Sequence, residues 1–300
     1  MNELAGLGPG FVVFDEVQLV KVREEHAVSR RREALEALVS ELAERDPGLC
    51  VLGMSATPVI NNLLEARKLL EIVTGRSHAD LATQPTVDNA LAVHRALMVN
   101  GFRYRPRYEI EIKPIPVEIK GNALLPELTN VGGVLALEQT LLPAKLEAIT
   151  PYVREGTLVY THYVTGMVGP IRDHLERLGF KVGLYTGDDK SGLEPFKARA
   201  LDVLIGSKSV GTGLNGRQTV CDQIVMFSLP WTSAKHEQIL GRVRRQGSAF
   251  GSVSEIVPQV VLDYDGDRWS WDKNREATIR YKRTLSDCAV DGKIPEAVRI

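Results

Sequence analysis

Two adjacent carboxylates follow a short apolar run near the start of the chain. Asp15 and Glu16 come directly after the segment FVVF at 11–14. If that run is a strand of a parallel sheet, its carboxyl end is where such sheets bind ligands. An aspartate there can hold Mg²⁺ against nucleotide phosphates, while a glutamate orients or deprotonates an attacking water. The pair indicates nucleotide hydrolysis, although simple solvation of a strand end produces the same pattern.

A second polar strand end occurs at 55–58, with the sequence SATP. Ser55 and Thr57 follow the apolar run LCVLGM at 49–54, and Pro58 favours a turn out of the strand. Neighbouring parallel strands present their carboxyl ends to one crevice, so we expect this loop to lie beside the acidic pair. The alternative interpretation is a Ser/Thr cap before the next helix.

A glycine-rich segment, GSKSVGTGLNG at 206–216, follows another apolar strand. Its glycines allow the backbone to approach a phosphate or ribose closely. Gly211, Gly213 and Gly216 also match the spacing of a dinucleotide-binding fingerprint. The next segment, RQTVCDQIVMF, is strand-like rather than helical, which argues against that fingerprint because the pyrophosphate needs a helix N-terminus.

The segment QILGRVRRQG at 238–247 places two arginines on one predicted helix face. On a helix over 232–245 that begins at Thr232 or Ser233, Gln238, Arg242 and Arg245 fall at i, i+4 and i+7. Guanidinium groups in that arrangement suit clamping of phosphates and stabilisation of charge during phosphoryl transfer. A solvated basic helix end is the alternative.

Composition narrows the class of protein. The chain has 300 residues, 44% of them hydrophobic, and 37 Lys+Arg balance 38 Asp+Glu, which excludes a polybasic coat protein and confines any polyanion site to a local groove. The three cysteines and six histidines lack zinc or disulfide spacing, so we expect ordinary packing or surface roles for the histidines and a reducing, cytoplasmic or nucleoid location. We expect neither a signal peptide nor a membrane span.

Apolar runs that alternate with helical patterns predict an α/β fold with parallel sheets. The predicted organisation has four parts: a half-lobe at 1–75, a connector at 76–150, a complete lobe at 151–262 and a helical tail at 263–300. We predict the first strand, 11–14, to be covered on both faces. The other predicted strands are 49–54, 157–162, 181–185, 202–207 and 223–228, and the predicted helices are 23–45, 62–73, 88–100, 165–178, 194–200 and 232–245. The connector also contains an alternating, strand-like segment, YEIEIKPIPVEIK, and two helices separated at Pro143. We expect a helix in the tail to dock on one lobe through Trp269 or Trp271.

The ordered set of motifs carries a resemblance. FDEVQ, SATPVINNLLEARKLL, LVYTHY, LIGSKSVGTGLN and PWTSAKHEQILGRVRRQG, in that order over 11–262, resemble the superfamily-two helicases and translocases, in particular their Swi/Snf-like branch. The resemblance implies tandem RecA-like lobes that close around ATP and Mg²⁺ and step along a nucleic acid. In this branch the polymer is duplex DNA, held by its phosphate backbone with little sequence preference.

The resemblance also implies a role for each matching residue. Asp15 matches the Mg²⁺-holding acid of a DEAH-type box and Glu16 its catalytic base, while Arg242 and Arg245 match the arginine fingers. Gln18 stands where the family usually has a His or Asp. The remaining matches are, for the nucleotide, Gln18, Gly211, Gly213 and Gln238, and, for nucleic acid and coupling, Ser55, Thr57 and Thr212.

One departure concerns the phosphate-binding loop. No Gly-x-x-x-x-Gly-Lys-Ser/Thr segment occurs, and the Gly292-Lys293 pair is followed by Ile294. We therefore expect a first lobe that is incomplete at its N-terminus, in a fragment, a truncated frame or a split enzyme whose Walker A half comes from a separate chain. Such a chain would have negligible ATPase activity alone and an open sheet edge near 11–14 and 49–54.

Two functional hypotheses follow. The chain is part of an ATP-dependent nucleic-acid translocase or helicase, or it is a catalytically inactive helicase remnant that acts as a nucleic-acid-binding or interaction module. A metal-dependent nuclease built on Asp15 and Glu16 would need more acidic ligands than the neighbouring sequence offers.

Overall fold

The computed structural model describes residues 10–20, 29–104, 109–211 and 219–296, and the chain divides into two compact units. Unit 1 is Met1–Arg105 together with Arg280–Ile300, and unit 2 is Pro106–Ile279. The division between the two units falls within the predicted connector at 76–150, because its residues up to 105 belong to unit 1 and the rest to unit 2.

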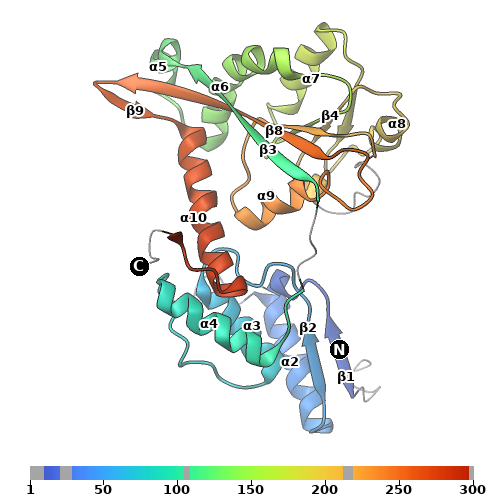
Figure 1. Ribbon diagram of the computed structural model, residues 1–300, viewed down its shortest axis with the longest axis vertical. Coiled ribbons are helices and arrows are strands. Elements are labelled where there is room, and N and C mark those ends of the chain that lie inside the picture. Colours follow the sequence, from blue (N-terminus) through green and yellow to red (C-terminus); the bar gives the residue numbers. More distant parts are fainter. Residues whose placement is uncertain (1–9, 21–28, 105–108, 212–218, 297–300) are drawn as a thin grey trace. The chain divides into compact units, whose positions relative to one another are not determined.

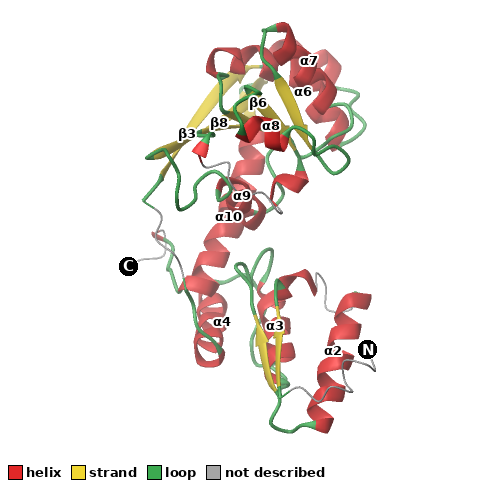
Figure 2. Cartoon of the chain, turned by 90° about the vertical axis from the view of Figure 1, so that its right-hand side faces the viewer, coloured by secondary structure: helices red, strands yellow, loops and turns green. Residues whose placement is uncertain are grey.

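Unit 1 is built on a parallel pair of strands, β1 (Phe11–Phe14) and β2 (Cys50–Gly53), joined residue for residue from Phe11 opposite Cys50 to Phe14 opposite Gly53. Figure 2 shows the pair beside α3. Both strands were predicted. The helical elements of the unit are the 3₁₀ turn η1 (Val17–Val20), α2 (Arg30–Arg45), α3 (Leu63–Thr74) and α4 (Val87–Asn100). The predicted start of α2 at 23 lies outside the described residues.

Helix α3 begins and ends as the sequence predicts. The side chain of Asn62 accepts a hydrogen bond from the Glu65 backbone N–H, which satisfies one of the donors that every helix start leaves open. Gly75 ends the helix in the left-handed region at φ 63°, which glycine adopts without steric cost. The helix buries Leu63, Leu69 and Ile72 in the core of the unit.

One face of the strand pair remains open. Phe11 is 55% exposed and Val13 is 45% exposed, so the expectation that 11–14 is covered on both faces is wrong for the described residues. Parallel strands are normally buried on both faces, because the connections between them pack helices there. One face of the described strand pair in unit 1 is therefore accessible to solvent.

Unit 2 contains a seven-stranded, mostly parallel sheet with six strands in the order β3-β8-β7-β4-β6-β5. The α/β fold class is confirmed. The strands are β3 (Glu111–Lys120), β4 (Thr157–Tyr160), β5 (Val182–Tyr185), β6 (Val203–Gly206), β7 (Gln223–Met226), β8 (Ser252–Tyr264) and the antiparallel β9 (Asp267–Trp269), which pairs with β8. The helices are α5 (Leu125–Leu128), α6 (Val134–Ile149), α7 (Val168–Arg177), α8 (Leu193–Lys197) and α9 (Ser233–Leu240), with 3₁₀ turns at η2 (Asn122–Leu124), η3 (Thr150–Tyr152) and η4 (Lys208–Gly211).

Strand β8 was not predicted, and it changes the meaning of the segment that was interpreted as connector. β8 lies between β7 and β3, and β3 pairs with it over ten residues (Figure 1). Pro114 and Pro116 are tolerated in β3 because an edge strand can lack backbone donors on its outer side. Residues 111–120 of the alternating segment are thus an edge strand of unit 2.

Helix α6 corrects a second prediction. The two helices expected on either side of Pro143 form one helix, Val134–Ile149, with the proline inside it. A proline in a helix interior removes one hydrogen bond and clashes with the preceding turn, so it normally breaks the helix. Here Leu142, Lys145 and Leu146 are buried on α6, and that packing outweighs the local preference.

The predicted tail helix is α10 (Trp271–Asp291). In unit 2 the Trp271 indole N–H donates to Glu138 Oε1 at 2.9 Å, and Ile279 packs into the core. Trp271, rather than the partly exposed Trp269, makes the predicted docking contact. The later residues Leu285 and Cys288 are buried in unit 1. Within the described ranges, no helix has the length and apolar character that spanning a membrane requires.

Candidate functional site

The acidic turn and the SATP loop lie together in unit 1, as their positions after parallel strands predict. The backbone N–H of Met54 donates to Phe14 O at 2.8 Å, and the N–H of Val17 donates to Met54 O at 3.0 Å. These bonds extend the parallel pairing past the ends of both strands. The two polar segments therefore start side by side at one edge of the sheet.

The acidic turn is strained at Glu16. Asp15 and Glu16 are both exposed, and Asp15 Oδ1 accepts the Glu16 backbone N–H at 2.8 Å. Glu16 has φ 51°, a left-handed conformation that costs a non-glycine residue about 1–3 kcal/mol. Its carboxylate accepts a short hydrogen bond from the Gln18 side-chain amide. The candidate base is thus held in one orientation by its neighbour.

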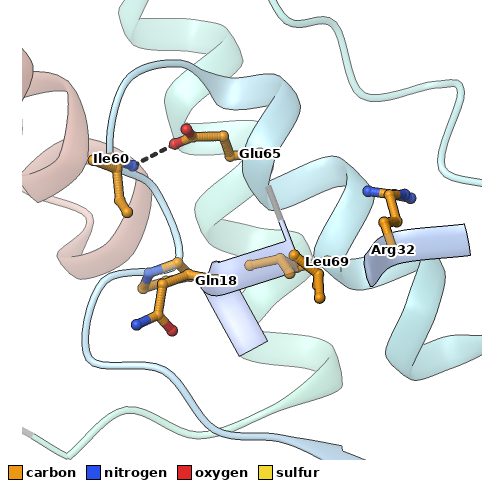
Figure 3. Close-up of a pocket in the computed structure, with 7 residues that line it drawn as sticks. Gln18, Arg32, Ile60, Glu65 and Leu69 are labelled. Carbon is orange, nitrogen blue, oxygen red and sulfur yellow. Dashed lines mark hydrogen bonds between the residues drawn. The ribbon is translucent and has the colours of Figure 1, made fainter. Parts of the chain in front are cut away.

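Gln18 connects the acidic turn with the SATP loop. It is 5% exposed and lines a cavity of about 10 Å³ together with Pro58, Ile60 and Leu69 (Figure 3). Its Oε1 atom is buried and has no hydrogen-bond partner among the described residues. A buried acceptor without a partner is costly, so Gln18 Oε1 is a locally unfavourable feature of this loop.

The SATP loop is held by its own side chains and by α3. Ser55 Oγ accepts the Thr57 backbone N–H at 3.0 Å, while Thr57 Oγ1 is buried without a partner in the described part of the chain. Glu65 is 4% exposed, and its Oε2 accepts the backbone N–H groups of Ile60 at 2.7 Å and Asn61 at 2.8 Å. The first helical turn therefore fixes the chain that leaves the loop.

The acidic residues suit Mg²⁺ only together with a nucleotide. In the described ranges, no three His, Cys, Asp or Glu side chains lie close enough to hold a metal ion by themselves. Mg²⁺ keeps several waters and is usually bound by one or two carboxylates plus substrate phosphates. The exposed carboxylate of Asp15 fits that arrangement, with the phosphates supplying the other ligands.

In unit 2 three segments follow the carboxyl ends of β4, β6 and β7, and we call this part of the unit the carboxyl edge. Residue 162 follows β4, Lys208 begins η4 after β6, and Trp231 follows β7. Gly211 ends η4. Thr212 and Gly213, two of the predicted contact residues, lie outside the described residues.

Helix α9 is shorter than predicted. Thr232 caps it as expected, since its side chain accepts the Lys235 backbone N–H, but the helix ends at Leu240 rather than 245. Gly241 follows, and the Arg242 N–H bonds to Ile239 O at 3.1 Å in a tighter turn. Glycine in a helix interior costs about 1 kcal/mol relative to alanine, which favours this early end. Gln238 is therefore helical, whereas Arg242 and Arg245 lie beyond the end of the helix.

Positive charge accumulates at the carboxyl edge. Burial lowers the pKa of Lys235, and Arg242 and Lys208 lower it further. Burial likewise lowers the pKa of His162 to about 4, with additional contributions from Lys208, Arg275 and Lys235. Every charge that shifts these two groups is positive, so the edge favours an anionic ligand.

Several residues of this edge were not identified from the sequence. Arg275, from α10, lies with its Cζ 3.0 Å from the ring centroid of Trp231. Lys145 is fully buried between Asp272 and Glu138, at 2.6 Å and 3.3 Å. The exposed tryptophan after a buried strand was the available signal, but its partners come from distant segments. His236, which was expected to have an ordinary packing or surface role, makes a 2.5 Å contact between its Nε2 and Glu255 Oε1.

The match to a protein family lies within unit 2. Residues 144–247 match the family described as the helicase conserved C-terminal domain. No curated protein matches the chain. The segment 144–247, which holds β4 to β7 and α9, is thus similar to helicase C-terminal domains.

Solved structures of helicases also resemble the chain, at 14% identity. Mycobacterium smegmatis helicase Lhr bound to ssDNA and AMP-PNP matches 83% of this chain and 28% of its own, with a TM-score of 0.45. S. cerevisiae Dbp5 bound to RNA and ADP BeF3 matches 91% of this chain and 57% of its own, with TM-scores of 0.46 and, for a variant, 0.47. The chain therefore spans between about a quarter and about three fifths of these proteins.

Proposed function

We propose that the chain is part of an ATP-dependent translocase or helicase of superfamily two, Swi/Snf-like in its motifs, that moves on duplex DNA. The proposal rests on the match of residues 144–247 to the helicase conserved C-terminal domain. In addition, several cations lie near one another at the carboxyl edge of unit 2. In this proposal the edge grips phosphates of the DNA backbone, so binding has little sequence preference.

The proposed nucleotide chemistry is divided between the units. Asp15 would hold Mg²⁺ bound to ATP phosphates, and Glu16, oriented by Gln18, would orient or deprotonate the attacking water. Arg242 and Arg245 would stabilise the charge of the transferred phosphoryl group. Gln238 and the glycine-rich loop that includes Gly211 and Gly213 would contact the nucleotide, and Ser55, Thr57 and Thr212 would couple its state to DNA.

A phosphate-binding loop has to come from another segment, and unit 1 contains a surface that fits such a partner. A groove of about 340 Å³ runs along the residues of β2 from Val51 to Ser55 and is also lined by Leu97, Met98 and Phe102. No described strand pairs with the side of β2 opposite β1. We propose that an extended apolar strand of the Walker A half, from a separate chain or a longer one, pairs with this edge.

DNA binding and ATP hydrolysis by the purified full chain test the proposal. We expect binding of random-sequence duplex DNA that weakens steeply with salt, and negligible ATPase activity until a partner with a phosphate loop is added. After that addition, Arg242→Ala should abolish ATP turnover, whereas exposed Arg172→Ala, a charge-matched control, should not. Salt-independent binding would contradict the assignment of the edge.

The second candidate is a catalytically inactive remnant that serves as a nucleic-acid-binding or interaction module. The absence of a phosphate-loop motif from this sequence is the observation that favours it. It predicts salt-sensitive DNA binding that neither ATP nor Arg242→Ala changes, whatever partner is supplied. ATP turnover by the completed enzyme would exclude it.

A further inference from the structure

The second half of α10 carries a short run of positive charge. Arg280, Lys282 and Arg283 are three cations within four residues, and residues 277–286 contain no Asp or Glu. The chain as a whole has a net charge of −1, so a polyanion has to bind where cations are locally concentrated. This run belongs to none of the ordered motifs and was not identified from the sequence.

The inner face of this part of α10 is anchored in unit 1, where it holds the chain that leaves the SATP loop. Ser286 Oγ donates to Val59 O at 3.0 Å, and Lys282 Nζ donates to Asn61 Oδ1 at 3.0 Å. Leu285 is buried in the same apolar cluster as Val59. The helix is therefore fixed to the core of unit 1 by hydrogen bonds and by apolar packing.

The outer face of the same helix carries the other two cations. Arg280 and Arg283 are exposed, and Tyr281 between them is 57% exposed. Residues three apart on a helix are neighbours, with about 5–6 Å between their Cβ atoms, so the two arginines start from one side of α10. Both arginines also have contacts within the protein. An exposed ion pair contributes only about 0–1 kcal/mol, so contacts of that kind do not prevent an arginine from binding a phosphate.

This outer face has the chemistry of a phosphate-binding surface. A guanidinium group donates two parallel hydrogen bonds to one phosphate, and tyrosine hydroxyls also donate to phosphate oxygens. Duplex DNA presents phosphates along its whole length whatever its sequence, so contacts of this kind need no unpaired base. The face therefore suits the polymer of the proposed function.

We propose that Arg280, Tyr281 and Arg283 form a contact for the phosphate backbone of duplex DNA on unit 1. The inference rests on the proposed function, because stepping along DNA requires a grip on each unit and the carboxyl edge belongs to unit 2. The same helix holds the chain after the SATP loop through Ser286 and Lys282. DNA bound to this face thus contacts the element that positions the proposed coupling loop.

The test uses the full chain, a fluorescent random-sequence duplex and a series of salt concentrations. The Gln pair, Arg280→Gln with Arg283→Gln, removes two charges, and the Lys pair, Arg280→Lys with Arg283→Lys, keeps them. Tyr281→Phe removes the hydroxyl alone. Arg30→Gln with Arg31→Gln is the matched control, because both arginines are exposed on α2 in unit 1 and their loss removes the same charge.

We expect the Gln pair to reduce the slope of log K against log salt by about 2 in magnitude, since each phosphate contact contributes about 0.9. The same relation amounts to about eightfold in affinity per contact between about 1 M and 0.1 M salt, so binding at the lower concentration should weaken more than about tenfold. The Lys pair should keep the slope, because lysines release the same counterions, and lose less than about threefold through its poorer geometry.

Tyr281→Phe should weaken binding by about two- to fivefold without changing the slope, because the hydroxyl is neutral. The control pair should keep the slope and bind within about twofold of the unaltered chain, because charges more than about 10 Å from the phosphates are screened. Far-UV circular dichroism checks that each variant retains its helices. Arg283→Gln alone, with an expected change of about 1 in slope, decides the question if the Gln pair does not fold.

The inference is overturned if the Gln pair binds duplex DNA with the slope and affinity of the unaltered chain, which would leave an acidic protein as the ligand class for this face. It is equally overturned if the control pair loses as much as the Gln pair, since the effect would then be one of net charge. A chain that binds no duplex in any of these forms overturns the proposed function itself, whereas failure of this inference alone leaves the binding of the unaltered chain intact.

Discussion

At the scale of single residues, unit 2 contains a lysine with no exposed surface. Lys145 contacts Asp272, Glu138 and the carbonyl of Phe227, at 2.6, 3.3 and 2.9 Å. Burial acts to lower the pKa of Lys145, but the two carboxylates outweigh it, so the pKa lies above its ordinary value. The ammonium therefore stays charged and neutralises two groups that cannot reach water.

Lys145→Met should destabilise unit 2 by about 3–5 kcal/mol, because it leaves buried carboxylates without a partner. All three tryptophans lie in unit 2, so urea unfolding followed by tryptophan fluorescence measures this effect. Adding Asp272→Asn and Glu138→Gln to Lys145→Met should recover much of the loss. A single variant as stable as the unaltered chain would contradict the buried charge network.

His162 should make the stability of unit 2 depend on pH. Its pKa of about 4 in the folded chain lies below the ordinary value of 6.5, so the unfolded chain binds more protons between these values. The stabilisation is complete above about pH 6.5 and is lost as the pH falls towards 4. His162→Gln should flatten the fall, measured again by tryptophan fluorescence.

The titration of His162 also reports on the ligand. A phosphate bound among Lys208, Lys235 and Arg275 would offset their positive field, so the His162 pKa, measured by NMR, should rise when DNA binds. A pKa that stays near 4 in a saturated DNA complex would place the phosphates elsewhere.

At the scale of elements, α3 holds the SATP loop through one buried carboxylate. Glu65 accepts two backbone N–H groups and the Asn61 side-chain amide, which donates to Oε1 at 3.0 Å. Glu65→Ala should therefore cost about 1.5–3 kcal/mol and speed amide hydrogen exchange in α3. Glu71→Ala on the same helix removes only ion pairs with Lys68 and Arg67, and should cost less than about 1 kcal/mol. Equal effects of the two substitutions would contradict this role.

The elements that the sequence predicts correctly are those with local signals. Asn62 and Gly75 mark both ends of α3, and apolar runs mark β4, β6 and β7. Strand β8 was not predicted, because Pro258 interrupts its pattern of apolar residues. In the structure, Pro258 lies beyond the part of β8 that pairs with β7. Pro143 led to the wrong prediction of two helices for the same reason, since tertiary packing and not local preference decides whether a proline is tolerated.

In the candidate site, too, the sequence predicts only the features that local signals and the order of the strands determine. The nearness of the acidic turn to the SATP loop follows from parallel strands, as predicted. The contact between Gln18 and Glu16 and the early end of α9 depend on details of packing and turn geometry. The pairing of Arg275 with Trp231 joins residues 44 positions apart in the sequence, and no spacing rule could have indicated it.

At the scale of the whole molecule, the two units differ in how completely their sheets are covered. Unit 2 has strands that are buried throughout, such as β4, β6 and β7, and two large core clusters lie on its sheet. The described part of unit 1 has two strands, and Phe11 and Val13 are largely exposed on one of them. Stability follows buried apolar area, so unit 1 should be the less stable of the two.

Thermal unfolding of the full chain should therefore proceed in two steps. Unit 1 carries helices α2, α3 and α4 but no tryptophan, so far-UV circular dichroism should lose helical signal at a lower temperature than tryptophan fluorescence changes. Phe14→Ala, in a half-buried contact of the unit 1 core, should lower the first transition by several degrees and leave the second in place. Coincident transitions with both probes would mean that the open strand pair does not weaken unit 1. A strand that pairs with the free edge of β2 should raise the first transition alone, because it binds only the folded form of that unit.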